Sequence, residues 1–215
     1  MRSKTDPANT RPATFHYHDL VIELHPEVYD PAEDSFLLLE SLQLNPQDSV
    51  LEIGTGCGLI ALSCARKGCR VFCTDINPFA VQVTRRNISR NQRLLQGAIE
   101  IRQGDLFSAF ENSERFNVIV FNPPYLPTQK QERTGGWFDI ATDGGRNGLK
   151  VTKRFLEGLS CRLLPKGSAY FIFSSLSNRH TLEQYLKKQE LNASIISRHL
   201  SEEEELDVYR VAPKA

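Results

Sequence analysis

The sequence predicts an α/β fold with a doubly wound, mostly parallel sheet of seven strands that ends in an antiparallel hairpin. Short apolar runs of strand length alternate with amphipathic stretches of helix length along most of the chain. Strands that are apolar on both faces indicate a sheet covered by helices on both sides, with right-handed crossovers. Near the C-terminus, only the polar stretch SEEEELD separates two strand-like runs, which favours a hairpin over a crossover helix. The expected architecture is therefore Rossmann-like.

The length of 215 residues fits one α/β domain that buries its core without disulfides or metals. Because three prolines interrupt its first part, we expect an irregular N-terminal segment at residues 1–28, with one short strand at about Leu20–Leu24. Residues 29–215 are expected to form a single domain.

The first helix is predicted in the stretch PAEDSFLLLESL. Pro31 suits a helix start, and Glu33 and Asp34 lie in the first turn, where the helix dipole favours carboxylates. The apolar stripe expected to face the core consists of Phe36, Leu39 and Leu42.

The remaining elements alternate along the chain. The seven strands of the sheet are expected at residues 49–54, 70–76, 99–103, 116–122, 167–174, 193–198 and 207–212. The further helices are expected at residues 58–68, 77–91, 149–163 and 181–188. In such a sheet, ligands bind at the carboxyl ends of the strands.

Charge and cysteine content argue against several classes of protein. Lysine plus arginine and aspartate plus glutamate each number 26, so we expect no stable nucleic-acid binding, which relies on many cations. The clustered cysteines contain no C-x-x-C pair, so we interpret them as buried thiols and expect no metal site. They are Cys57, Cys64, Cys69 and Cys73. The odd cysteine count, the polar N-terminus and the lack of a membrane-length apolar run predict a cytoplasmic protein that does not enter a membrane.

The stretch LEIGTGCGL follows the first strand of the sheet and opens a helix. Gly54, Gly56 and Gly58 let a ligand approach the backbone closely. A dinucleotide fingerprint has its third glycine one position later, where Leu59 stands. A tight strand-to-helix turn without a ligand would explain these glycines about as well.

Carboxylates lie at the ends of three consecutive strands, at Glu52, Asp75 and Asp105. Asp75 stands about 20 residues after the glycine loop, where a carboxylate can accept both hydroxyls of a ribose. Asp105 would reach an adenine amino group. Because the three strand ends meet in one crevice, the predicted ligand is a positively charged ribonucleoside, and S-adenosylmethionine fits.

These residues resemble the class I S-adenosylmethionine methyltransferases and, among them, the HemK-type protein glutamine N5-methyltransferases. The resemblance covers roughly residues 29–211, in VYDPAEDSFLLLESL, LEIGTGCGL, CTDINPFAV, GDLF, FNPPYLP and DGGRNG. The first and last stretches are similar to the branch that modifies class I release factors of eukaryotes and archaea, and we expect none of the extra helical domain of the bacterial branch. The resemblance implies the class I methyltransferase fold, so residues 29–215 would be the methyltransferase domain.

The resemblance also implies a set of cofactor-binding residues. They are Glu52, Gly54, Thr55 and Gly56 around the methionine part, Asp75 at the ribose, Asp105 and Leu106 at the adenine, Tyr29, Ala32, Asp34 and Ser35 from the first helix, and Ile76 and Asn122. A second interpretation stays open for Glu33 and Asp34, as ordinary first-turn carboxylates.

The stretch FNPPY, residues 121–125, ends the fourth strand. An amide nitrogen is a poor nucleophile because its lone pair is delocalised into the carbonyl. The side-chain oxygen of Asn122 and the carbonyl of Pro123 can each accept one N–H of a substrate amide. Pro123 and Pro124 supply rigid φ angles and no competing donors, and Tyr125 offers a flat face. We interpret these four residues as catalytic, although a plain turn would also use Asn-Pro-Pro.

The rest of catalysis is expected to be alignment in a dry site, without a strong general base. Asp139 and Asp143 are therefore weak candidates for a base. The connection at residues 128–148 has the length of a functional loop. Its Trp137 and Phe138 would line a substrate groove or pack the loop onto the core.

Three other functions compete with this interpretation. A nucleic-acid methyltransferase acting on adenine N6 or guanine N2 could use the same motif, but the balanced charge and the lack of a target-recognition domain argue against it. The intact Asn122 and Pro123 argue against a non-catalytic cofactor-binding scaffold, and the glycine spacing against a nicotinamide dehydrogenase. A second substrate, such as a lysine or a small molecule, is compatible with the same site.

The strand at residues 98–103 is expected at an edge of the sheet, where unpaired backbone groups invite another strand. Either charges such as Glu100 and Arg102 protect this edge, or a partner covers it. The resemblance implies a partner, a small zinc-binding activator protein.

Overall fold

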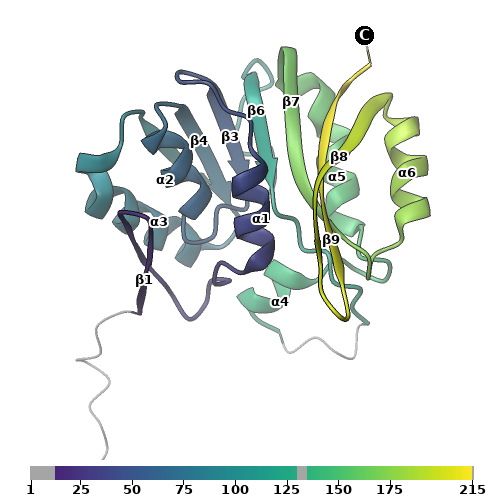
Figure 1. Ribbon diagram of the computed structural model, residues 1–215, viewed down its shortest axis with the longest axis horizontal. Coiled ribbons are helices and arrows are strands. Elements are labelled where there is room, and N and C mark those ends of the chain that lie inside the picture. Colours follow the sequence, from purple (N-terminus) through teal and green to yellow (C-terminus); the bar gives the residue numbers. More distant parts are fainter. Residues whose placement is uncertain (1–12, 130–134, 215) are drawn as a thin grey trace, which may run out of the picture.

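The structure is a computed structural model that describes residues 13–129 and 135–214 (Figure 1). The expectations for residues 1–12 and for residues 130–134 of the long loop lie outside the described residues.

A seven-stranded sheet with the order β5-β4-β3-β6-β7-β9-β8 forms the centre of the fold. Its strands are β3 (Ser49–Ile53), β4 (Arg70–Asp75), β5 (Ile99–Gln103), β6 (Phe116–Phe121), β7 (Leu163–Ser174), β8 (Leu191–Leu200) and β9 (Glu205–Pro213). The strands from β3 to β7 run parallel, whereas β9 lies antiparallel between β7 and β8. The predicted mostly parallel sheet with its terminal hairpin is confirmed.

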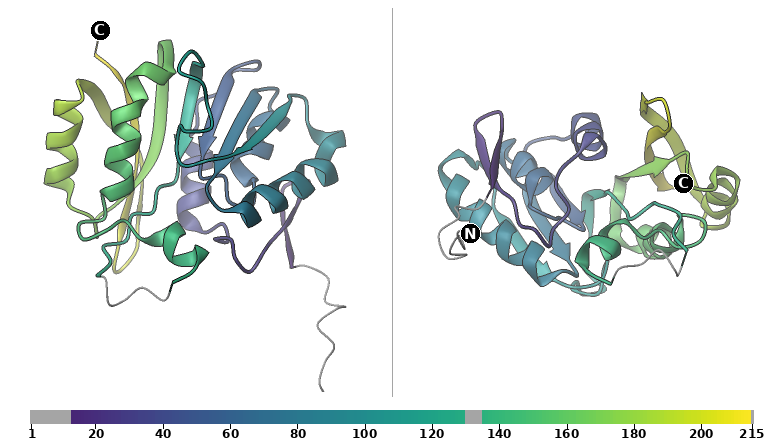
Figure 2. Two further views of the ribbon diagram at one scale, coloured as in Figure 1. Left: turned by 180° about the vertical axis from the view of Figure 1, so that it is seen from behind. Right: turned by 90° about the horizontal axis from the view of Figure 1, so that it is seen from below.

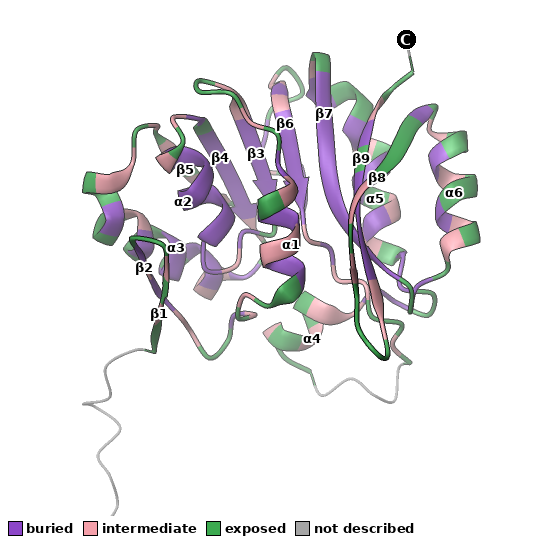
Figure 3. Cartoon of the chain, viewed as in Figure 1, coloured by how far each residue is buried: buried purple, intermediate pink, exposed green. Residues whose placement is uncertain are grey.

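Alternate residues along the central strands enter two separate cores, one on each face. Val118 and Val120 of β6 belong to one core, and Ile119 and Phe121 belong to the other. Figure 3 shows the central strands buried along most of their length. This is why these runs read as continuously apolar in the sequence.

Helices cover both faces of the sheet. The first core is covered by α1 (Glu33–Ser41), α2 (Leu59–Arg66) and α3 (Pro78–Asn91). The second core is covered by α5 (Lys150–Leu159) and α6 (Arg179–Lys188), which face the viewer in the left panel of Figure 2. A short helix, α4 (Trp137–Thr142), lies beyond the carboxyl end of β6 and was not predicted (Figure 1).

The N-terminal segment needs a correction. Residues expected to be irregular form a hairpin of β1 (Thr14–Tyr17) and β2 (Leu20–Glu23), of which only the second strand was predicted. Asn87 and Asn91 of α3 accept hydrogen bonds from the backbone of β2 through their side-chain oxygens. These hydrogen bonds join the hairpin to α3 and thus to the rest of the fold.

The apolar stripe of α1 also differs from the prediction. Leu38, together with Leu39, is buried in the core, whereas Phe36 is only partly buried and stacks on Tyr17 of β1. The missed β1 strand explains the difference, since it supplies the surface on which Phe36 packs. The helix expected at residues 149–163 ends at Leu159 and is followed by a 3-10 turn, Ser160–Arg162.

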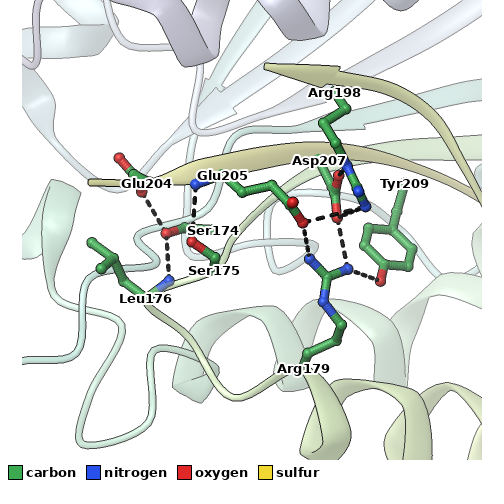
Figure 4. A network of polar contacts seen from close by, with 9 residues as sticks. All are labelled: Ser174, Ser175, Leu176, Arg179, Arg198, Glu204, Glu205, Asp207 and Tyr209. Atoms are coloured by element: carbon green, nitrogen blue, oxygen red, sulfur yellow. Dashed lines mark hydrogen bonds and ion pairs between the residues drawn. The ribbon is translucent and has the colours of Figure 1, made fainter. Parts of the chain in front are cut away.

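A buried polar network anchors the C-terminal hairpin (Figure 4). Asp207 of β9 is 0% exposed and accepts hydrogen bonds from Arg179 at 2.6 Å and Arg198 at 2.6 Å. Arg179 also donates to Glu205 and to the hydroxyl of Tyr209. The network thus ties α6 to β8 and β9 at the carboxyl end of β7.

All four clustered cysteines are buried, as predicted, and Cys161 is exposed. Within residues 13–129 and 135–214, three or more potential metal ligands do not come together anywhere. None of the described helices is both long and apolar enough to cross a membrane.

Candidate active site

A cavity of about 460 Å³ lies at the carboxyl ends of the parallel strands, within the size range of small-molecule sites. Every residue predicted for the site lines it except Ala32, which caps α1 and is exposed. The lining residues from the prediction are Tyr29, Asp34, Ser35, Glu52, Gly54, Thr55, Gly56, Asp75, Ile76, Asp105, Leu106, Asn122, Pro123, Pro124 and Tyr125.

The glycines of the loop between β3 and α2 have two different functions. All three have positive φ angles, of 66° at Gly54, 57° at Gly56 and 86° at Gly58, which favour glycine. Gly54 and Gly56 line the cavity. A Cβ on Gly58 would instead lie 2.8 Å from the side chain of Thr84 in α3. The third glycine is therefore required for helix packing, which accounts for a spacing unlike that of a dinucleotide loop.

Asp75 fixes the shape of the glycine loop. One carboxylate oxygen accepts a hydrogen bond from the Gly56 N–H at 2.9 Å, and the other accepts one from the Asn77 N–H at 2.9 Å. Burial raises the pKa of Asp75, while these backbone N–H groups oppose the rise. Each oxygen keeps a lone pair that can accept a further donor from the cavity.

Glu52 also stabilises the glycine loop, through hydrogen bonds to Thr55 and Ala61. It is buried and accepts hydrogen bonds from the Thr55 hydroxyl at 2.6 Å and from the Ala61 N–H at 3.0 Å. Burial raises the pKa of Glu52 to about 8, in spite of these two donors. Both of these hydrogen-bond donors are neutral, so neither of them compensates a charge on the carboxyl group.

Asp105 has a partner that the sequence did not indicate. Arg154 of α5 forms an ion pair with it at 2.7 Å, and both side chains line the cavity. The side chain of Asp105 is 42% exposed and that of Arg154 is 50% exposed, so the ion pair lies at the mouth of the cavity and not in its interior. The two residues are separated by 49 positions, and no motif links them.

Asp34 lies against the NPPY motif. It is 3% exposed, and one of its oxygens accepts hydrogen bonds from the Asn122 amide at 2.9 Å, the Tyr125 hydroxyl at 3.2 Å and the Tyr29 hydroxyl at 3.3 Å. Its other oxygen accepts from the backbone N–H of Ser35 at 2.6 Å. Burial and the Asp34 charge hold the pKa of both tyrosines far above their usual range, so both hydroxyls stay donors.

The two carboxylates in the first turn of α1, Glu33 and Asp34, have different surroundings. Asp34 is directed into the cavity and contacts the motif. Glu33 is 73% exposed and pairs with His199 of β8, as expected of an ordinary surface carboxylate.

The side-chain oxygen of Asn122 is buried and has no hydrogen-bond partner among the described residues. A buried acceptor without a donor is unfavourable by about 1–3 kcal/mol, and such groups are uncommon in folded proteins. Because Asn122 lines the cavity, a ligand with an N–H group can supply the missing donor.

The long loop also contributes to the cavity. Trp137 and Phe138 of α4 line it, and Phe138 is 59% exposed, so the loop does not pack this ring into the core. Asp139 and Asp143 accept hydrogen bonds from the backbone N–H groups of Gly135 and Gly145. These two carboxylates therefore stabilise the loop.

Comparison with known proteins agrees with this geometry. Residues 29–195 match the methyltransferase small domain family. The chain is 40% identical to the putative protein N5-glutamine methyltransferase MJ0928 of Methanocaldococcus jannaschii, over 82% of this chain and 87% of that protein. It is 31% identical to methyltransferase HEMK2 of Homo sapiens, over 86% of this chain and 89% of that protein.

Among solved structures, the fold is shared with the E. cuniculi Mtq2–Trm112 complex, responsible for methylation of the translation termination factor eRF1. The TM-score is 0.68 at 22% identity, over 87% of this chain and 99% of that chain. With the cavity, the glycine loop and the NPPY motif in the arrangement described above, the chain belongs to the methyltransferase small domain family and, within it, to the HemK-type methyltransferases.

Proposed function

We propose that this protein transfers a methyl group from S-adenosylmethionine to the side-chain amide nitrogen of a glutamine in a class I release factor. The observation that carries the proposal is the buried side-chain oxygen of Asn122, which has no partner among the described residues and belongs to a residue that lines the cavity. The names of the two relatives and of the solved complex support glutamine and a termination factor as the substrate.

The chemistry of an amide explains why this corner is rich in acceptors. The Asn122 oxygen and the Pro123 carbonyl would accept the two N–H groups of the substrate amide, which raises the electron density on its nitrogen. Tyr125 lies in the same cavity, with its hydroxyl turned to Asp34, so the ring can pack against a planar amide. Alignment of the nitrogen with the donated methyl group accounts for the remaining catalysis.

The cavity fits the proposed cofactor. Gly54 and Gly56 leave backbone accessible, and Asp75 offers two oxygens where ribose hydroxyls would bind. Asp105 and Leu106 would hold the adenine, and Glu52 and Thr55 would lie near the methionine part. The cofactor supplies an electrophilic methyl group on a sulfonium ion. The protein's own residues bind, orient and exclude water.

The test is mass spectrometry of a candidate release factor after incubation with the protein and isotopically labelled S-adenosylmethionine. We expect one labelled glutamine and no label when that glutamine is replaced by glutamate. Asn122→Ala should reduce transfer to a small residual rate that the labelled cofactor still detects and leave cofactor binding nearly unchanged, and the matched surface variant Asn192→Ala should behave as wild type. Label in adenine or guanine of an RNA or DNA substrate, with none in the release factor, would contradict the proposal.

The edge strand β5 is proposed to bind a small zinc-binding activator protein. It lies at the end of the sheet, paired only with β4 among the described strands. Arg102 forms ion pairs with Glu100 at 2.7 Å and Glu114 at 2.9 Å. The two charged side chains of the strand, Glu100 and Arg102, are thus paired with groups of the same chain. Backbone pairing with an added strand then remains available.

Hydrogen exchange after co-expression with a candidate activator tests this partner. The outward amides of β5 should gain protection, while those of β8, at the opposite edge of the sheet, should not. Equal protection at both edges, or a fully active protein whose β5 amides do not change, would argue against an activator at this edge.

A further inference from the structure

We infer that Asp34 is a positioning residue that fixes which end of the Asn122 amide faces the substrate. This role rests on the proposed acceptor function of Asn122. It differs from the cofactor contact that the family resemblance implies for Asp34.

The orientation of Asn122 follows from what each group can donate. An ionised carboxylate only accepts hydrogen bonds, whereas a side-chain amide has a donating NH₂ group and an accepting oxygen. The NH₂ group of Asn122 must therefore face Asp34, 2.9 Å away. The Asn122 oxygen is then the end of the amide that is left for a ligand: it is buried and has no partner among the described residues, and Asn122 lines the cavity. Without Asp34, rotation of the amide by 180° would place a donor against the substrate N–H.

The backbone N–H of Ser35 also fixes the orientation of the side chain at position 34. Its N–H donates to the second oxygen of Asp34 at 2.6 Å, and a backbone N–H cannot exchange its donor for an acceptor. In Asp34→Asn, the amide oxygen at position 34 must therefore stay on the Ser35 N–H. The new NH₂ group would face Asn122, Tyr29 and Tyr125, all of which are donors in the wild type. Asn122 would relieve this conflict by turning its own oxygen toward residue 34.

The experiment measures turnover and cofactor binding separately in Asp34→Asn. We expect the kcat at saturating cofactor and substrate to fall by about 100-fold or more, because a misplaced reacting group costs rates of this order. We expect the dissociation constant of S-adenosylmethionine, from calorimetry, to change less than about threefold. Glu33→Gln is the matched control, since it makes the same change one residue earlier on an exposed side chain, and it should match wild type in both measurements.

A double-mutant cycle separates positioning from a general structural effect. In an Asn122→Ala background, Asp34→Asn should lower kcat by less than about threefold, because the group that Asp34 orients is already absent. Equal losses of kcat in both backgrounds would overturn the inference. So would a more than tenfold loss of cofactor affinity with kcat retained, which would make Asp34 a cofactor ligand.

The two proposals can fail separately. If the wild-type protein labels a nucleic-acid amine and no glutamine, the proposed substrate is wrong, but the Asp34 cycle can be run on that substrate. If glutamine is labelled and the cycle is additive, the substrate stands and the positioning role of Asp34 is wrong.

Discussion

Two buried carboxylates, Asp34 and Asp207, each collect several donors, but the two clusters differ in what they leave unpaired. Around Asp207 the donors are guanidinium groups of Arg179 and Arg198, and each of its two carboxylate oxygens accepts at least one of them (Figure 4). Around Asp34 the donors are neutral, and the Asn122 oxygen has no partner among the described residues. Hydrogen bonds that satisfy a buried carboxylate hold a fold together, whereas a buried acceptor without a partner, on a residue that lines a cavity, is available to a ligand.

The largest expected effect concerns stability at Asp207. Asp207→Asn should lower the free energy of unfolding by about 2 kcal/mol, because the buried acceptor loses its charge, while the partly exposed Arg179 and Arg198 keep Glu205 as a partner. Asp34→Asn should lower it by only about 1 kcal/mol, since neutral donors are less costly to leave unpaired. Urea unfolding of both variants measures the difference. Equal losses would show that the two clusters do not differ in the way described.

The second effect extends the comparison to Asp75, a partly buried carboxylate that accepts hydrogen bonds from the backbone N–H groups of Gly56 and Asn77. Asp75→Ala should weaken S-adenosylmethionine binding by about tenfold or more, because it releases the glycine loop and removes the ribose acceptor. Asp75→Asn, which keeps one acceptor oxygen, should lose less. Calorimetry measures both, and unchanged affinity in the alanine variant would remove Asp75 from the site.

The third effect depends on pH and concerns Glu52, a buried carboxyl without a cation. The folded protein keeps a proton on Glu52 up to about pH 8, whereas the unfolded chain releases it near the ordinary value of 4.5. The folded state therefore binds more protons in this window. The contribution of Glu52 to the free energy of unfolding should fall as the pH rises, by at most about 1.4 kcal/mol per pH unit.

Unfolding of wild type and Glu52→Gln between about pH 5 and pH 8 isolates this contribution, because the variant cannot ionise. Glu114→Gln is the control: Arg102 lowers the pKa of Glu114 below its ordinary value of 4.5, so its contribution is lost only at more acidic pH and should stay constant between about pH 5 and pH 8. A difference between wild type and Glu52→Gln that does not change with pH would contradict the raised pKa.

The smallest effect concerns the hydroxyl of Tyr125. Tyr125→Phe removes one of three neutral donors to one Asp34 oxygen but keeps the ring, so turnover on the glutamine substrate should fall only about three- to tenfold. Tyr29→Phe, which removes another of these donors, should have a similar effect. A loss as large as that of Asn122→Ala would mean that the hydroxyl, and not the ring, acts on the substrate.

The sequence by itself determined the sheet, its terminal hairpin and the motif residues at the carboxyl ends of the strands that line the cavity. Apolar periodicity shows which runs lie in a sheet with two covered faces, and the ends of parallel strands bring Gly54, Asp75 and Asn122 to one edge. The pattern did not show β1, whose few partly exposed residues carry a weak signal. Nor did it show α4, which lies on the surface of a long loop.

Only the tertiary structure decided how the side chains of the site are paired. Asp34 and Asn122 are separated by 88 positions, and Asp105 and Arg154 by 49. No local propensity connects residues at such distances; packing of α1 and α5 against opposite faces of the sheet brings each pair together. The same packing leaves the Asn122 oxygen without a donor, because hydrogen bonding depends on the neighbours that the fold supplies, whereas strand and helix signals depend on neighbours along the chain.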